Sequence, residues 1–167
     1  MGDYEMNKLY LITGPCGIGK STVSIEIAKR IDKSVLIEGD DIYNFFVGGR
    51  ISPWKDGAPL DLFWDNCIYL INSYLSRGYD VIFSYIINPK DLEMLRKKFS
   101  DYQIIFKVLI AKKDVVIKRD KMRIVDNQMG NRAVVLLDKF INNYSDEFLL
   151  DTSLLSVDEV VERIMLL

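Results

Sequence analysis

Gly14-Pro15-Cys16-Gly17-Ile18-Gly19-Lys20-Ser21 is the stretch that decides the fold of this chain. It matches the pattern G-x-x-x-x-G-K-[ST], which forms a loop that holds the phosphates of ATP or GTP. Glycines let the backbone turn tightly and bring its N–H groups close to anionic oxygens. Lys20 supplies a positive charge for the β- and γ-phosphates, and the Ser21 hydroxyl is a ligand for Mg²⁺. The stretch, hereafter the phosphate loop, therefore predicts a site for a nucleoside triphosphate.

The residues on either side of the phosphate loop strengthen this prediction. An apolar run over 9–13 precedes the loop, and apolar side chains recur at helical spacing from Val23 to Ile31. Strand, loop and helix in that order form the structural context of such a loop, and the helix dipole adds to the anion site. The predicted nucleotide contacts in this region are Gly14, Pro15, Cys16, Gly17, Ile18, Gly19, Lys20, Ser21 and Thr22.

Composition limits the class of protein. The chain has 167 residues, of which 49% are hydrophobic and 28% charged, and it fits one domain over 1–167. A formal net charge of −2 argues against a surface that coats nucleic acid, so we expect a small-molecule partner and a monomer or homodimer. Histidine is absent, which leaves carboxylates as the candidate bases.

The expected compartment is the cytosol. A free Cys16 inside a phosphate loop suits a reducing environment, and Cys67 has no partner at a metal-binding spacing. The first residues show no signal-peptide pattern, and no apolar run approaches the ~18 residues that a membrane span needs.

Strands and helices are predicted to alternate along the chain. The expected strands are 7–13, 34–37, 79–87, 102–111 and 148–152. The expected helices are 20–31, 42–47, 62–77, 89–99, 113–120, 133–144 and one that begins with a capping box at Ser156. The stretch 48–59 is rich in Gly and Pro, and so long a loop is more often functional than idle. The alternation predicts a single α/β domain with a parallel sheet.

Sequence motifs distinguish between the classes of nucleotide-binding protein. A GTPase needs an Asp-x-x-Gly switch, and no glycine here has Asp three residues before it; Asn88-Pro89-Lys90-Asp91 has its lysine in the wrong place for reading guanine. A motor ATPase has an acidic residue at the end of an apolar strand, whereas the third expected strand offers Ser84. Length and motif order favour a small-molecule kinase.

Four stretches resemble the small P-loop kinases of the gluconate, shikimate and adenylylsulfate kinase type. They are the phosphate loop, Glu38-Gly39-Asp40, the arginine-bearing segment 119–132 and Leu150-Asp151-Thr152-Ser153. The chain also resembles bacterial AAA-type ATP-binding kinases and antibiotic-modifying phosphotransferases. The resemblance implies a three-layer P-loop fold, a five-stranded parallel sheet of order 2-3-1-4-5 and a small helical lid over about 119–132.

The resemblance also implies roles for individual residues. Glu38 joins Ser21 in holding Mg²⁺ through water, and Asp40 orients the acceptor hydroxyl or acts as base. Lys20 acts on the phosphates together with the lid arginines, Arg119 and Arg123 foremost and then Arg132, while Thr152 and Ser153 lie against adenine. The chain departs from the family pattern where Glu38 replaces the usual Asp and where Ser84 replaces an acid or asparagine.

The acceptor side is expected in the segment of about 42–62 and in the start of the next helix. The candidate substrate-binding residues are Asp40, Asp41, Arg50, Trp54 and Asp65, with Lys55, Asp56 and Trp64 nearby. Three alternatives stay open. Asp40 or Asp41 can cap the helix expected at Ile42, the tryptophans can cover the core, and the lid arginines can form a solvated basic face.

The sequence thus predicts an ATP- and Mg²⁺-dependent phosphotransferase that acts on a hydroxyl of a small molecule such as a sugar, nucleoside or antibiotic. One alternative is a nucleotide-binding protein, ATPase or resistance factor without kinase activity. A further alternative is a polynucleotide 5′-hydroxyl kinase.

Overall fold

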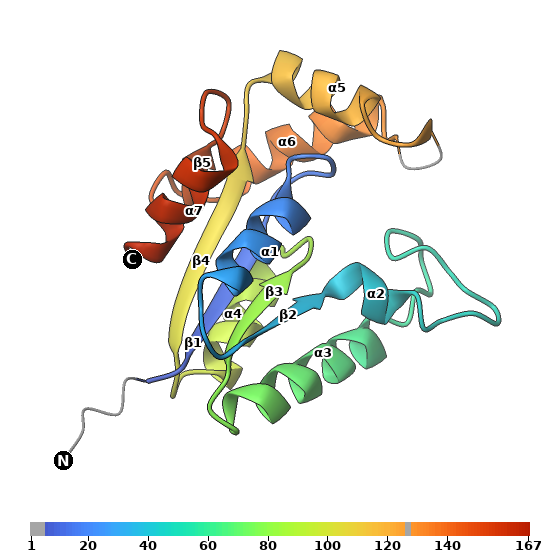
Figure 1. Cartoon of the computed structure of the whole chain (residues 1–167). Coiled ribbons are helices and arrows are strands. Elements are labelled where there is room, and N and C mark those ends of the chain that lie inside the picture. The colour runs from blue at the N-terminus through green and yellow to red at the C-terminus, as the bar shows by residue number, and fades with distance from the viewer. Residues whose placement is uncertain (1–5, 126–127) are drawn as a thin grey trace.

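A computed structural model describes residues 6–125 and 128–167 of the chain. Its centre is a five-stranded parallel sheet of order β2-β3-β1-β4-β5 (Figure 1). The strands are β1 Lys8–Thr13, β2 Ser34–Glu38, β3 Asp80–Ser84, β4 Gln103–Ile110 and β5 Leu149–Asp151. The predicted α/β class and strand order are confirmed. In the part of the chain that the structure describes, no helix is both long and apolar enough to cross a membrane.

Helices cover both faces of the sheet, as right-handed strand–helix–strand connections require. They are α1 Lys20–Lys29, α2 Gly39–Tyr43, α3 Leu60–Leu75, α4 Pro89–Lys98, α5 Lys113–Lys121, α6 Asn131–Asn143 and α7 Val157–Met165. In Figure 1, α1 and α7 lie on one face and α3 and α4 on the other, while α5 and α6 sit at the end of the sheet where β4 stops.

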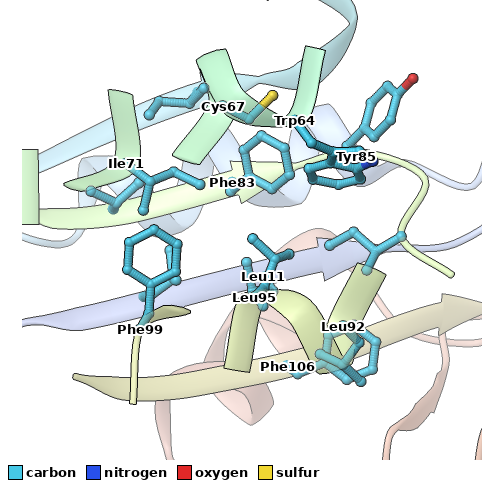
Figure 2. Close-up of a cluster of buried hydrophobic side chains, with 14 of the residues drawn as sticks. Leu11, Trp64, Cys67, Ile71, Phe83, Tyr85, Leu92, Leu95, Phe99 and Phe106 are labelled. Carbon is cyan, nitrogen blue, oxygen red and sulfur yellow. The ribbon is translucent and has the colours of Figure 1, made fainter. Parts of the chain in front are cut away.

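The core on the α3 and α4 face holds the aromatic residues that border the site. Side chains alternate along β1, so Leu11 points to this face and Ile12 to the opposite one. Figure 2 shows Trp64 and Tyr85 next to each other at one end of this cluster. Their ring centroids are 5.8 Å apart and the ring planes are nearly perpendicular, which is an edge-to-face contact. The Trp64 ring is therefore held by packing before any ligand binds.

The third strand and the second helix show the largest differences from their predicted bounds. The third strand ends at Ser84, not Ile87, because side chains take over its backbone bonds: the Thr13 hydroxyl accepts from Ile87 N at 2.9 Å, and Tyr144 Oη donates to Ile87 O at 2.7 Å. The second helix begins at Gly39, not Ile42, and its N-cap is Glu38. Asp40 and Asp41 lie in its first turn, so neither is the N-cap residue.

Candidate functional site

The phosphate loop joins β1 to α1 at the carboxyl end of the sheet, where open α/β folds bind ligands. Gly14 has φ 143°, and a Cβ there would lie 2.4 Å from the Leu109 carbonyl oxygen of β4. Gly19, the N-cap of α1, has φ 108°. Only glycine satisfies both the positive φ and the close approach at Gly14. The strand-to-helix turn therefore brings backbone N–H groups to one place.

Lys20 is held in position by the loop itself. Its Nζ donates to Gly14 O and Pro15 O, each at 3.0 Å. Burial lowers the pKa of Lys20, while the neighbouring Cys16, Asp40 and Glu38 side chains act to raise it. The ammonium therefore faces an environment that a polyanion would complement.

A phosphate pocket of about 260 Å³ opens above this loop. It brings together residues from the loop, the end of β2, the start of α2, the end of β3 and the segment just after α5. Its lining consists of Cys16, Gly17, Gly19, Lys20, Ser21, Thr22, Glu38, Asp40, Ser84 and Arg123. Gly14 and Pro15 do not line the pocket, and contribute the carbonyls that hold Lys20.

Glu38, Ser21 and Ser84 form an oxygen-rich corner of the phosphate pocket. Burial raises the pKa of Glu38, with Asp40 and Asp41 adding to the effect and the Ser84 and Ser21 hydroxyls opposing it. Within residues 6–125 and 128–167, Glu38 Oε1 and Ser84 Oγ are buried without a hydrogen-bond partner. Hard oxygen donors with unused lone pairs fit Mg²⁺, which keeps waters and phosphates as its other ligands. In the described chain, no group of three or more acidic, Cys or His residues is arranged to hold a metal ion by itself.

Asp40 and Asp41 differ in their position relative to this pocket. Both carboxylates are exposed in the first turn of α2, but only Asp40 lines the phosphate pocket. Between Glu38 and Asp40 the backbone of Gly39 packs against the Tyr85 ring, where a Cβ would lie 2.5–2.8 Å from ring and Cβ atoms. This contact fixes the direction in which the two neighbouring acids leave the strand.

Arg119 connects the phosphate loop to the segment after β5. Its Nη1 donates to Ile18 O at 3.1 Å and to Thr152 Oγ1 at 2.9 Å, and its Nη2 donates to Thr152 O at 3.1 Å. A neighbouring pocket of about 300 Å³ is lined by Gly17, Ile18, Gly19, Thr22, Val23, Arg119, Met122, Thr152, Leu155, Val157 and Val160. Its shape and mostly apolar wall suit a nucleobase. Ser153 does not line it, because the hydroxyl is bonded to Asp151 and Lys112 N.

Arg123 lies above the phosphate loop and is positioned by Asp120. The Asp120 carboxylate is 3% exposed, accepts hydrogen bonds from Met129 N and Gly130 N, and lies 3.6 Å from Arg123 Nη1. Arg123 Nη1 is buried without a hydrogen-bond partner in the described chain. A Cβ on Gly17 would lie 3.4 Å from Arg123 Cδ. The guanidinium is therefore close to where phosphate oxygens would bind.

On the acceptor side, a cavity of about 260 Å³ lies next to the Gly39–Tyr85 contact. We call it the acceptor cavity; its lining is Pro53, Trp54, Leu60, Trp64, Tyr85, Ile86, Asn88, Asp91, Arg132, Leu136 and Lys139. Arg132 lies over the Trp54 ring, with 3.8 Å between the guanidinium carbon and the ring centroid. Arg50 instead bonds to Asn44 Oδ1, and neither Arg50 nor Asp65 lines the cavity.

Several residues of the site are not among the sequence-derived candidates. Tyr85, Asn88, Asp91, Leu136 and Lys139 line the acceptor cavity, and Asp120 supports the lid. The Asn88 and Asp91 side chains also form a capping box for α4. That box is readable from sequence, because Asn precedes Pro and an acid follows three residues later. The other residues carry no motif and depend on which elements meet in space.

No protein-family model matches the chain. A tRNA dimethylallyltransferase from Petrotoga mobilis is 39% identical over 56 residues, which is 33% of this chain and 18% of that protein. The chain thus aligns with less than a fifth of the length of this curated relative.

Solved structures match nearly the whole chain. A tunicamycin resistance protein from Deinococcus radiodurans gives a TM-score of 0.68 at 20% identity, covering 96% of this chain and 94% of that one. A gluconokinase from Sinorhizobium meliloti gives a TM-score of 0.64 at 20% identity, covering 97% of this chain and 91% of that one. A chain of the Pnkp1/Rnl/Hen1 RNA repair complex gives a TM-score of 0.65 at 20% identity, covering 86% of this chain and 48% of that one. The chain therefore has the fold of the small P-loop kinases.

Proposed function

We propose that the protein is an ATP- and Mg²⁺-dependent phosphotransferase that moves the γ-phosphoryl group to a hydroxyl of a small molecule. One observation carries this proposal: the Asp40 carboxylate lines the same pocket as Lys20 and Ser21. A carboxylate beside the phosphates repels their charge, so its presence there favours a role in the reaction. A phosphotransferase needs one close to the acceptor hydroxyl.

The proposed reaction assigns each group a task. Lys20, the loop N–H groups and Arg123 neutralise the charge of the triphosphate. Arg119 holds the phosphate loop in place next to the nucleobase pocket. Asp40 accepts the proton of the acceptor hydroxyl. The bond from that oxygen to the γ-phosphorus forms as the bond to the β,γ-bridging oxygen breaks, and ADP leaves. Ser21 and Glu38 would hold Mg²⁺, which supplies charge neutralisation between the β- and γ-phosphates.

The alternatives differ in what accepts the phosphoryl group. A nucleotide-binding protein or ATPase without kinase activity would transfer to water or to nothing. A polynucleotide 5′-hydroxyl kinase is the second alternative, because one structure of similar fold belongs to an RNA repair complex. The formal charge of −2 favours a small acceptor over a nucleic acid.

Transfer from γ-labelled ATP to a panel of acceptors tests the proposal. The panel comprises sugars, nucleosides, aminoglycosides and oligonucleotides with a 5′-hydroxyl. We expect Mg²⁺-dependent labelling of one small-molecule class. Slow release of labelled phosphate with no labelled acceptor would contradict a kinase, and labelling of oligonucleotides alone would favour the polynucleotide kinase.

A further inference from the structure

The acceptor cavity is walled mainly by flat and apolar side chains. Trp54, Trp64 and Tyr85 form part of the wall, with Pro53 and Leu60 beside them. Trp64 is 9% exposed and is held by ring contacts with Phe63 and Phe83, whereas Trp54 is 59% exposed. The cavity thus combines one fixed indole with one exposed indole, of which Arg132 covers one ring face.

Polar groups in the acceptor cavity are few and partly committed. Asn88 Oδ1 accepts from Asp91 N at 2.9 Å, and Asp91 Oδ2 accepts from Asn88 N at 3.2 Å. Arg132 and Lys139 are left as donors. A polyhydroxylated chain needs a partner for each hydroxyl it buries, because an unpaired polar group costs free energy. The flat apolar surface of the cavity suits a planar base better than a polyhydroxylated chain.

A planar group already occupies the face of Trp54. The Arg132 guanidinium carbon lies 3.8 Å from the ring centroid, a distance typical of two flat groups in contact. A nucleobase has the same flat shape, and its carbonyl oxygens and ring nitrogens would accept hydrogen bonds from Arg132 and Lys139. Stacking on an aromatic side chain is also the usual way in which proteins hold an unpaired base.

The acceptor cavity lies next to the phosphate pocket. Tyr85 lines the cavity and packs on Gly39, while both neighbours of Gly39, Glu38 and Asp40, line the phosphate pocket. The Asp40 charge acts to raise the pKa of Tyr85, after the larger effect of burial, which also indicates proximity. A sugar joined to a base in the cavity would therefore point its hydroxyl toward Asp40.

We infer that the acceptor is a nucleoside unit whose base stacks on Trp54 and faces Arg132 and Lys139. The inference deepens the proposed function and depends on it for the reaction, but not for binding. The nucleoside unit has two sources, a free nucleoside or the 5′-terminal nucleoside of an oligonucleotide. The cavity volume of about 260 Å³ lies near the lower end of small-ligand sites, roughly 300 Å³, so the cavity takes one such unit at most.

Equilibrium dialysis of the full chain tests this inference. The probes are labelled uridine, a dinucleotide with a 5′-hydroxyl and gluconate, with saturating ADP and Mg²⁺ so that the nucleotide pocket is filled. We expect uridine or the dinucleotide to bind and gluconate not to bind. Stronger binding of the dinucleotide identifies a strand end as the source, and equal or weaker binding identifies the free nucleoside.

Variants locate the bound base. Trp54→Ala is expected to weaken binding about 5- to 100-fold, as for the loss of one base–aromatic stack, whereas Trp54→Phe keeps most of the affinity. Phe45→Ala is the matched control, because Phe45 is an exposed aromatic residue of the same α2–α3 connection outside the cavity lining. Circular dichroism checks that each variant is folded.

The outcomes separate this inference from the proposed function. Binding that depends on Trp54 without any transfer keeps the nucleoside site and overturns the kinase. Transfer to a sugar without nucleoside binding keeps the kinase and overturns the nucleoside site. Three further outcomes overturn the nucleoside site: binding of gluconate alone, binding of none of the probes, or equal effects of Trp54→Ala and Phe45→Ala on binding.

Discussion

The donor and acceptor halves of the site are built in different ways. The donor half consists of the phosphate pocket and the nucleobase pocket, and it relies on backbone groups of one continuous loop and on Arg119, which bonds to two carbonyls. The acceptor half is the acceptor cavity, whose wall comes from side chains of the 48–59 loop, α3, the segment after β3, α4 and α6. A phosphate-binding site can therefore be fixed by spacing, whereas acceptor recognition depends on side chains from several separate segments.

Removal of the Lys20 ammonium should give the largest effect, confined to the donor half. Lys20→Ala is expected to lower kcat about 100- to 1,000-fold, the cost of losing one preorganised group that stabilises transition-state charge. Nucleoside binding without ATP should be unchanged. Lys29→Ala, at the far end of α1 in a surface pair with Glu26, is the control and should keep full activity. Loss of nucleoside binding in Lys20→Ala would mean that the halves are not separable.

Asp120 tests whether the lid is part of the donor half. Asp120→Ala leaves Met129 N and Gly130 N without their acceptor, and a buried unsatisfied donor costs about 1–3 kcal/mol. Urea unfolding of Asp120→Ala should show this decrease in the free energy of unfolding. ATP binding should also be weaker, because Arg123 loses the carboxylate that positions it. Asp138→Ala, which breaks only the exposed pair with Lys113, should cost about 0–1 kcal/mol. Similar losses in the two variants would contradict the assigned role.

The contribution of Asp120 to stability should depend on pH. Burial acts to raise the pKa of Asp120, but the Met129 and Gly130 amides and the Arg123 charge outweigh it and hold the pKa below its usual value. A depressed pKa gives stability that is present above the unfolded value of about 3.9 and is lost as the pH falls through the folded value. The difference in unfolding free energy between the native chain and Asp120→Ala should therefore narrow below about pH 4.

Gly39 tests the contact between the two halves, with a smaller expected effect. In Gly39→Ala the new Cβ would meet the Tyr85 ring at 2.5–2.6 Å, and overpacking of this kind costs about 1–3 kcal/mol. Displacement of Tyr85 should weaken acceptor binding more than ATP binding. Gly48→Ala, where a Cβ has nothing within 4 Å, is the matched control. Equal acceptor affinity in both variants would show that Tyr85 does not shape the cavity.

Much of the fold follows from the sequence because local signals agree with the tertiary structure. The phosphate loop, the buried strands and the capping box at Ser156 have fixed spacings, and the structure has the predicted sheet order. The largest errors in the predicted bounds occur where tertiary contacts decide: Thr13 and Tyr144 end the third strand early, and the Gly39–Tyr85 packing accompanies an earlier start of α2.

The site is only partly predictable for the same reason. Lys20, Ser21, Glu38, Asp40 and Arg123 line one pocket, and each belongs to a short motif. Asp120 and Tyr85 have no motif, since their roles depend on burial, of Asp120 against the Met129–Gly130 backbone and of Tyr85 against Gly39. Arg50 and Asp65 are predicted to bind the acceptor because they lie near the expected acceptor side in the sequence. The structure places neither in the cavity lining. Proximity along a loop does not determine the direction of a side chain.

The central claim is that Asp40 connects the two halves as the base. The most direct test measures ATP affinity and transfer to the labelled acceptor in Asp40→Asn, with Asp41→Asn as the matched control one residue away. We predict that Asp40→Asn binds ATP at least as well as the native chain and loses about 100-fold or more in transfer, while Asp41→Asn stays within a few-fold. Unchanged transfer in Asp40→Asn, or an equal loss in both variants, would contradict the account.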